Sequence, residues 1–470
     1  MSSLDQRDIS RLARAGISEV EARRQIALLR SPPRPAELDR ACTIGDGIRQ
    51  IADAERPALV AAWRQAAGEG RFSKFVPASG AASRMFSSLA EVRSEAAPSL
   101  DELHSRSANG DRQAESFVEL LGRLPELPFY EELLAGSGLG PDEIASVASS
   151  DEYPKLLAVL LDPNGLAFSE RPKGLIPFHR YPASRRTAFE EHLVEGGGYL
   201  RDELGPARIH FTVAEPQLAA FESAAVTSVW VAGNEVSFST QGRSTQTLSL
   251  GADGEPTRTR QGDLLLRPGG HGALLPNLET MGGDLVYIKN IDNVLPESRQ
   301  AEVILWQRLL GGLLIDLERW ARRLPPPDVR PLRVCGMVRN SGEPGGGPFW
   351  VKAADGGTRA QIVESAEVDL DDPEQATIWT SSTHFNPVML VTALRHPGGE
   401  PYRLSEHVDP QAVFLSHKPF EGHRIRVLEH PGLWNGAMAD WDTVFVEVPE
   451  ATFAPVKTVH DLLRPAHQGS

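Results

Sequence analysis

The chain has 470 residues, of which 41% are hydrophobic, and a formal net charge of −15. This acidic balance excludes nucleic acid as the main partner, because binding to a phosphate backbone needs clustered positive charge. The two cysteines, Cys42 and Cys335, form no disulfide framework, and the chain starts without an apolar signal segment, so we expect a cytoplasmic protein that does not contact a membrane.

The first 70 residues are predicted to form a helical extension, because apolar residues recur at intervals of three and four. Residues 72–76 then read FSKFV and end at Pro77, which is typical of a strand. Small residues follow and lead into helix-forming sequence. From there to residue 165 helical patterns alternate with Gly and Pro breaks, and we expect a helical insertion at about 88–165.

From residue 171 onward, short apolar runs alternate with helical segments and turns. Strands that alternate with helices argue for βαβ units and a mainly parallel sheet. The most apolar helical run, residues 303–317, is too short and too polar to span a bilayer and is predicted to be a core helix. We therefore expect residues 71–470 to form one large α/β domain, with helices on both faces of a mostly parallel, twisted sheet.

A first candidate site is the segment PASGAASRMF at 77–86. A turn of small residues between a strand and a helix lets backbone N–H groups approach an anion, and the start of the helix adds its dipole. Arg84 adds a fixed charge. The candidate anion-binding residues are Ser79, Gly80, Ala81, Ala82 and Ser83. The alternative is a small turn without a ligand, which is common between a strand and a helix.

Three later segments also carry candidate residues. Lys173 lies in RPKGLIPF, and PGGHG at 268–272 precedes the strand of IKNIDN, which ends at Asp292. An Asp at the carboxyl end of a parallel strand faces the ligand crevice and can hold Mg²⁺. The last segment, FAPVK, places Lys457 on a turn that two prolines make rigid. The alternatives are an Asx turn at Asp292 and a surface lysine at Lys457.

These segments and their order resemble the UDP-sugar pyrophosphorylases of the nucleotide-diphospho-sugar transferase superfamily. PASGAASRMF is similar to A-G-G-x-G-T-R-M/L, with Ser79 and Ala82 in place of glycines, and RPKGLIPF is similar to P-K-x-L-x-P. PGGHG is similar to P-x-G-H-G, and residues 448–463 are similar to V-P-x-S-x-F-x-P-V-K-T-x-x-D-L-L. The whole set also resembles an uncharacterised bacterial family, a domain of unknown function.

The resemblance implies a GT-A-like, Rossmann-like fold and a Mg²⁺-dependent nucleotidyltransferase. Such an enzyme joins an NTP and a sugar 1-phosphate to give a nucleotide sugar and pyrophosphate, and UTP is the nucleotide that the resemblance favours. It implies charge-neutralising roles for Arg84, Lys173 and Lys457, and a metal ligand in Asp292. The residues implied in nucleotide binding are, beside the first turn, Gly269, Gly270, His271 and Gly272. Those implied in sugar binding are Asn293, Glu364 and Asn386.

Two other functions stay open. The chain could be a nucleotide or nucleotide-sugar binder that lost turnover through Ser79 and Ala82, or a GT-A-type glycosyltransferase that uses Asp292 for its metal. Release of pyrophosphate, of nothing, or of a nucleoside diphosphate separates the three. For the nucleotidyltransferase, four residues have to converge on one cleft at the carboxyl ends of the strands: Arg84, Lys173, Asp292 and Lys457. They can do so only if residues 88–165 leave and rejoin the sheet at one edge.

Overall fold

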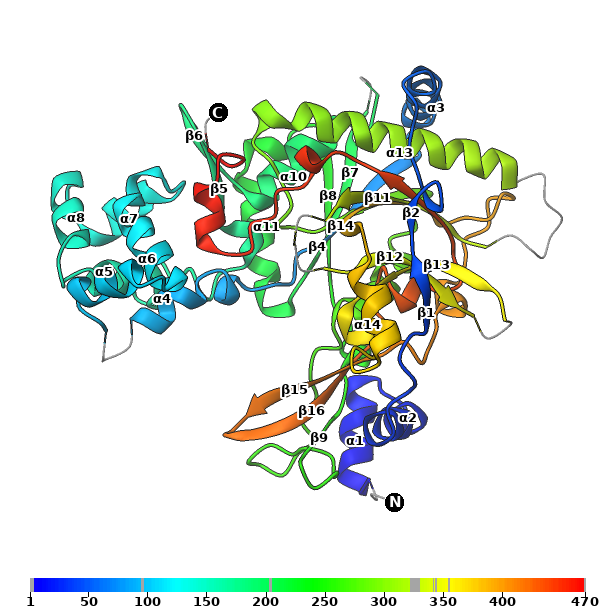
Figure 1. Cartoon of the computed structure of the whole chain (residues 1–470), viewed down its shortest axis with the longest axis horizontal. Helices are drawn as coiled ribbons and strands as arrows, with labels where there is room; N and C mark the ends of the chain where they lie inside the picture. The colour runs from blue at the N-terminus through cyan, green and yellow to red at the C-terminus, as the bar shows by residue number, and fades with distance from the viewer. Residues whose placement is uncertain are drawn as a thin grey trace.

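The computed structural model describes residues 4–93, 97–202, 205–321, 330–340, 342, 345–353 and 356–468 (Figure 1). Its centre is a nine-stranded sheet. From edge to edge the strands are β2 (Thr43–Ile44), β3 (Gly47–Arg49), β17 (Asp442–Glu447), β11 (Leu332–Arg339), β14 (His384–Ala393), β10 (Leu285–Lys289), β4 (Phe72–Pro77), β7 (Ala207–Val213) and β8 (Asn234–Thr240).

The prediction of a mostly parallel sheet is confirmed. Among the described strands of this sheet, β14 alone runs against its neighbours, β10 and β11. The other pairs are parallel. The sequence did not indicate the direction of β14, because all ten of its residues are buried and a continuous apolar run carries no sign of strand polarity.

Alternate residues of the central strands feed two cores on opposite faces of the sheet. Tyr287 and Val391 pack with helices α3 (Arg56–Gly68), α10 (Ala188–Gly197) and α13 (Gln300–Ala321). Val286 and Leu390 pack with α12 (Leu275–Thr280) and with residues 433–441. Helices therefore cover both faces, as predicted, and α13 contains the predicted core helix at 303–317.

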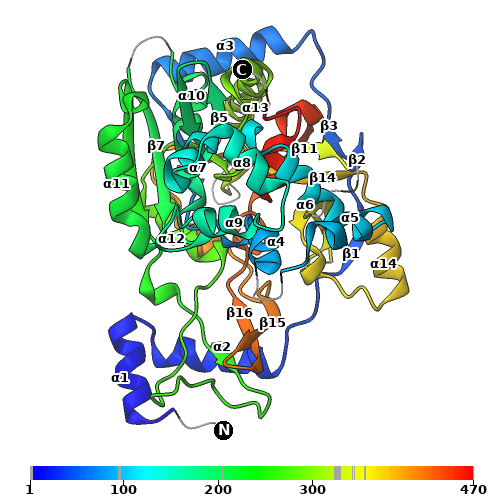
Figure 2. The same cartoon turned by 90° about the vertical axis from the view of Figure 1, so that its left-hand side faces the viewer.

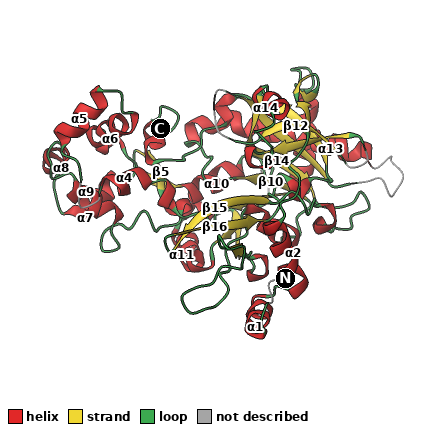
Figure 3. Cartoon of the chain, turned by 60° about the horizontal axis from the view of Figure 1, so that its bottom comes forward, coloured by secondary structure: helices red, strands yellow, loops and turns green. Residues whose placement is uncertain are grey.

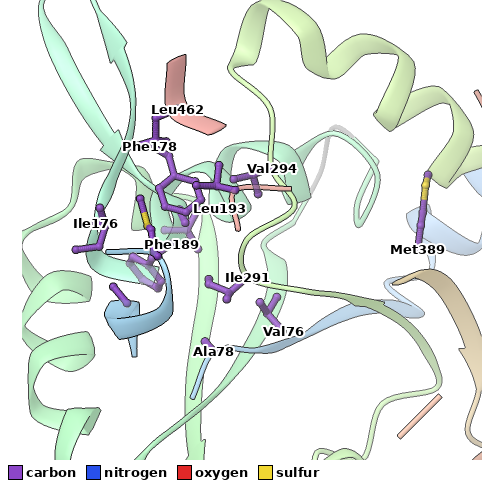
Figure 4. Packing of buried hydrophobic residues seen from close by; sticks show 14 of the residues in the cluster. Val76, Ala78, Ile176, Phe178, Phe189, Leu193, Ile291, Val294, Met389 and Leu462 are labelled. Atoms are coloured by element: carbon purple, nitrogen blue, oxygen red, sulfur yellow. The ribbon is translucent and has the colours of Figure 1, made fainter. Parts of the chain in front are cut away.

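The first core continues to the carboxyl edge of the sheet, where it joins segments that are far apart in the sequence. Figure 4 shows Val76 and Ala78 at the end of β4, Ile291 after β10, and Leu462 near the end of the chain in one buried cluster. Apolar packing thus brings together the segments that carry the candidate site residues.

The described part of 88–165 is a group of helices beside the sheet, which Figure 3 shows apart from the strands. The helices are α4 (Ser87–Val92), α5 (Leu100–Ala108), α6 (Arg112–Gly122), α7 (Tyr130–Ser137), α8 (Pro141–Ala148) and α9 (Pro154–Leu161). Their helical character agrees with the sequence pattern, although residues 94–96 lie outside the described residues. The boundaries of the insertion and of the catalytic domain stay predictions.

The first 70 residues are not helical throughout. Helices α1 (Gln6–Ala15) and α2 (Glu19–Arg30) pack on a small sheet of β9 (Ser249–Leu250), β15 (Phe414–Phe420) and β16 (His423–Glu429) (Figure 2). Residues 38–49, however, contain strands. β1 (Leu38–Ala41) pairs with β12 (Gly347–Lys352), which pairs with β13 (Thr358–Val363), and β3 pairs with β17. Pairing with distant strands overrides the local helical preference here. Residues 1–3 lie outside the described residues.

The remaining described elements are α11 (Leu218–Thr227), α14 (Pro373–Thr380) and a hairpin of β5 (Pro177–Tyr181) and β6 (Ser184–Thr187). None of the helices within the described residues is both long enough and apolar enough to cross a membrane.

Candidate functional site

Four segments that are distant in the sequence meet where β4 and β10 end. They are the turn at 79–84, residues 171–173, residues 290–293 and residues 453–459. Both strands are parallel neighbours, so their carboxyl ends reach the same edge of the sheet. Each segment is bonded to the next, and the four close into a ring.

The turn after β4 is held by the chain that returns from the helical group. The N–H of Ala82 donates to the carbonyl of Arg171, and the N–H of Lys173 donates to the carbonyl of Gly80, each at 3.0 Å. The chain therefore leaves the sheet and returns to it at one place, as an insertion between Arg84 and Arg171 requires. The second of these hydrogen bonds also holds Lys173 beside the turn.

The turn itself differs in part from the expectation. Gly80, Ala81 and Ser83 are exposed and Ser79 is half-buried, but the methyl group of Ala82 is buried in the core. The chain then continues as a single 3₁₀ turn, Ala82–Arg84, before the short helix α4. The helix that the sequence predicted after the turn is present as α4, but it has only six residues and begins after Arg84, so the contribution of a helix dipole is small. The exposed guanidinium of Arg84 is the fixed charge at this point.

Lys173 and Asp292 form an ion pair at the centre of the ring. Lys173 Nζ lies 2.8 Å from Asp292 Oδ2, and their side chains are 13% and 26% exposed. The carbonyl of Asp292 accepts the N–H of Val456 at 3.0 Å. The predicted convergence of Lys173, Asp292 and the FAPVK segment is thus present in the structure.

Lys457 is exposed at the end of that segment. Its backbone is held in place by a carboxylate as well as by the two prolines. Asp461 Oδ2 accepts the N–H of Lys457 at 2.8 Å and the N–H of Thr458 at 2.6 Å. The N–H of Val459 donates to the carbonyl of Met85 at 3.0 Å. This last bond closes the ring, because Met85 directly follows Arg84.

Two residues predicted to bind sugar are buried and bond to the backbone of the protein, and their role in sugar binding stays a prediction. Asn293 is 1% exposed, and its Oδ1 accepts the N–H of Ala454 at 3.2 Å, so it joins the end of β10 to the FAPVK segment. Asn386 is buried as well, and its Oδ1 accepts the N–H of Val388 at 3.0 Å. Val388 has a φ of 56°, so this bond supports a strained backbone within β14.

The glycines of PGGHG make room for neighbouring chain. A Cβ on Gly272 would lie 1.9 Å from the carbonyl oxygen of Pro431, and one on Gly269 would lie 2.4 Å from that of Thr245. Gly270 has a φ of 74°. Close packing and backbone conformation therefore explain these glycines, and their predicted contact with the nucleotide stays a prediction.

His271 and Glu364 face each other, and both side chains are partly exposed. Its Nδ1 accepts the N–H of Leu433 at 2.9 Å, and its ring stacks on Trp434 with 4.1 Å between centroids. Burial lowers the pKa of His271 to about 4, so the ring is neutral at pH 7 and its proton lies on Nε2. Nε2 is 4.0 Å from Glu364 Oε1. Burial raises the pKa of Glu364, and the neighbouring Glu429 raises it further.

A cavity of about 780 Å³ lies where β4, β7 and β8 end. Its lining includes Ser79, Glu215, Gln241, Arg243, Gln246 and Pro268, and Arg11 and Arg14 of α1. Sequence reasoning identified Ser79 but missed the others. Glu215 and Gln241, which follow β7 and β8, could have been identified from the sequence, because polar residues that follow parallel strands face the same edge of the sheet. Nothing in the sequence indicates that Arg11 and Arg14 of α1 reach this edge.

The chain belongs to the family described as "Domain of unknown function (DUF4301)", which matches residues 5–324 and 328–468. No curated protein matches the sequence.

The fold is similar to that of solved UDP-sugar pyrophosphorylases, as the sequence motifs predicted. For uridine diphosphate N-acetylglucosamine pyrophosphorylase from Trypanosoma brucei, in complex with inhibitor, the TM-score is 0.52 and the identity 13%, over 94% of this chain and 74% of that one. For a mutant of UDP-glucose pyrophosphorylase from Leishmania major, the TM-score is 0.50 and the identity 14%, over 98% of this chain and 78% of that one.

Proposed function

We propose that this member of the DUF4301 family is a nucleotidyltransferase that joins an NTP and a sugar 1-phosphate and releases pyrophosphate. One observation carries the proposal: the closed ring of contacts that brings the turn after β4, Lys173, Asp292 and the Lys457 segment to one edge of the sheet. The similarity in fold to UDP-sugar pyrophosphorylases, and the mostly parallel sheet with helices on both faces, support a GT-A-like domain.

The ring suits in-line attack of a sugar-phosphate oxygen on the α-phosphorus of an NTP. Such a transfer needs positioning and neutralisation of charge more than it needs a covalent intermediate. Arg84 and Lys173 would offset the charge of the triphosphate and of the attacking phosphate. Lys457, on the adjoining segment, would hold the sugar phosphate.

Asp292 fits a role as a Mg²⁺ ligand. Mg²⁺ is usually held by one or two carboxylates together with substrate phosphates and water, so a single partly exposed carboxylate beside a phosphate site suffices. The part of the chain that the structure describes contains no group of three or more His, Cys, Asp or Glu that could hold a metal ion. When bound, the ion would neutralise phosphate charge.

The remaining features suggest where the two substrates bind. The cavity that Ser79 lines is large enough for a nucleoside, and we propose UTP as its nucleotide. The partly exposed side chains of His271 and Glu364, backed by the buried Trp434, offer a neutral imidazole N–H and a carboxylate. These groups can hydrogen-bond the hydroxyls of a sugar ring. The cysteines, both free and buried, fit the proposed cytoplasmic location.

The test has two stages. A thermal-shift panel of NTPs and sugar 1-phosphates with Mg²⁺ selects the ligands, because a ligand that binds the native state raises its stability. Pyrophosphate release is then measured with the selected pair, using Asp292→Asn as the matched variant. We expect Mg²⁺-dependent release by the wild type and loss of most of it in the variant. Ligand binding without any release would instead favour a non-catalytic binder, and release of a nucleoside diphosphate from a nucleotide sugar would favour a glycosyltransferase.

A further inference from the structure

A fully buried ionic network lies beneath the proposed site. It consists of Lys74 of β4, Lys289 at the end of β10 and Glu195 of α10. Glu195 Oε1 lies 3.1 Å from Lys74 Nζ, and Oε2 lies 2.5 Å from Lys289 Nζ. The hydroxyl of Tyr199 donates to Oε1 as well. An apolar cluster of similar volume is often as stable as buried charges or more so, so this network points to a role other than stability.

The ionisation of the network agrees with its geometry. Burial lowers the pKa of Lys74 to about 8, although Glu195 opposes that shift. Burial alone would raise the pKa of Glu195, but the ammonium groups of Lys289 and Lys74 outweigh burial and hold it below its usual range. A single carboxylate is therefore shared between two cationic side chains on neighbouring strands.

The network joins the two strands that deliver the proposed site. β4 runs into the turn at 79–84, and β10 runs into Asp292, three residues after Lys289. The two strands are parallel neighbours. Because each carboxylate oxygen of Glu195 bonds to one of them, α10 fixes both strands close to their exits from the sheet.

A second residue of α10 holds the backbone just before Asp292. His192 Nε2 lies 3.1 Å from the carbonyl of Asn290 and 3.2 Å from that of Ile291. Both neighbours are acceptors, so the proton of the ring is on Nε2. Burial, reinforced by Lys74, keeps the pKa of His192 well below its usual value, so the ring is neutral.

The other ring nitrogen of His192 has no hydrogen bond in the part of the chain that the structure describes, so the orientation of this side chain has an energetic cost. His192 Nδ1 is buried and has no hydrogen-bond partner among the described residues. Leaving a buried acceptor unpaired is unfavourable. A side chain selected for stability alone would avoid this, whereas one selected to grip the Asn290 and Ile291 carbonyls requires the orientation seen here.

We infer that His192 and Glu195 are positioning residues: they hold the exit of β10 in the conformation that places the Asp292 carboxylate against the Lys173 ammonium. Neither residue is exposed, so neither touches a substrate. The inference rests on the proposed function only for the roles of Asp292 and Lys173. The positioning itself can be measured without turnover.

The first experiment uses a zero-length carbodiimide cross-link, which converts a carboxylate and an amine in direct contact into an amide. The yield of the peptide linked through Lys173 and Asp292 is measured by mass spectrometry in the full chain. His192→Phe removes the donor but keeps a ring, and we expect the yield to fall by roughly tenfold, because two hydrogen bonds to the exit are lost. His192→Gln keeps an amide donor and should recover part of the yield.

The matched control is Phe189→Leu. Phe189 is a buried residue of the same helix that packs on Phe211 and Phe238, and its side chain has no donor for the Asn290 or Ile291 carbonyl. It should lower thermal stability while leaving the cross-link unchanged. An unchanged yield in His192→Phe, or an equal fall in Phe189→Leu, would overturn the inference.

Kinetics supply the second readout. We expect His192→Phe to lower kcat by roughly 10- to 100-fold, as is typical when a supporting residue behind a ligand is lost, with KM for the nucleotide nearly unchanged. If His192→Phe does not fold, the triple variant Lys74→Met/Glu195→Gln/Lys289→Met tests the contact that Glu195 makes with the two strands without leaving a buried ammonium group unpaired, and a fall in cross-linking is expected there as well. If the wild type releases no pyrophosphate, the proposed function fails, while the cross-link still decides the positioning.

Discussion

The Lys173–Asp292 pair allows catalysis to be separated from stability. The perturbation is a double-mutant cycle of Lys173→Met, Asp292→Asn and both together. The two side chains are 2.8 Å apart but 13% and 26% exposed, so water screens their attraction. We therefore expect each variant to lose only about 1 kcal/mol of unfolding free energy. For a chain of this length that corresponds to a change in Tm of about one degree.

The expected effect on activity is much larger. Loss of one preorganised group that stabilises charge in the transition state typically lowers the rate by roughly 100- to 1000-fold, or about 3–4 kcal/mol. The assay is pyrophosphate release by the wild type and the three variants, beside their thermal unfolding. If the pair acts on the substrates, each single variant and the double variant are all strongly impaired.

A matched pair supplies the control. Lys155 and Glu152, 2.6 Å apart on the exposed side of α9, form an ion pair outside the site. Lys155→Met and Glu152→Gln should leave activity unchanged. If the double variant at Lys173 and Asp292 recovers most of the activity lost by the single variants, the pair is a structural salt bridge, and the reasoning that places Mg²⁺ and phosphate there is refuted.

Three further predictions follow from single contacts. Lys457→Ala should lower kcat/KM by roughly 100- to 1000-fold with little change in Tm. The control is Lys418→Ala, at an exposed lysine of β15, which should change neither kcat/KM nor Tm. A loss of less than about threefold in Lys457→Ala would contradict the role of Lys457. Gly272→Ala should lower the unfolding free energy by more than about 2 kcal/mol, because its Cβ would meet the Pro431 carbonyl at 1.9 Å, whereas Gly80→Ala meets nothing within 4 Å and should leave Tm unchanged. Burial raises the pKa of Glu367 to about 8, so the native state keeps a proton that the unfolded state has lost. The unfolding free energy of the protein should therefore fall as the pH rises from about 5 to 8. Glu367→Gln should reduce this pH dependence, as measured by denaturant titrations at several pH values.

Much of the fold follows from pattern. Alternation of apolar runs with helical periodicity is enough to predict a mainly parallel sheet covered on both faces. What the pattern omits is pairing between distant segments. The strands at residues 38–49 exist because β12 and β17 lie beside them, and neither partner is detectable from the local sequence. The direction of β14 is hidden for a similar reason, since a strand buried on both faces looks the same in either orientation.

The site shows a different limit. The order of the motifs predicted that Lys173, Asp292 and the Lys457 segment converge, and the ring of bonds contains all three. Residue type did not predict the contacts that these residues make within the protein. Gly272 and Asn293 were assigned to substrate because of the resemblance, and the structure shows in addition that Gly272 makes room for Pro431 and that Asn293 accepts the N–H of Ala454. Their part in substrate binding stays a prediction. A glycine that admits a ligand and a glycine that admits its own chain look identical in the sequence.

Whether a side chain points into the site or into the core also decides what the two replaced glycines of the turn mean for turnover. Ser79 and Ala82 replace two glycines of the pyrophosphorylase turn, and both replacements would narrow a phosphate site if their side chains pointed into it. Ala82 does not, because its methyl group is buried in the core while its N–H holds the carbonyl of Arg171. Only Ser79 lines the cavity, and its small hydroxyl can donate to a phosphate oxygen. Gly80, between them, keeps open space around its Cα. The side chain of Ala82 therefore takes no space on the exposed side of the turn, which supports the proposal of an active nucleotidyltransferase.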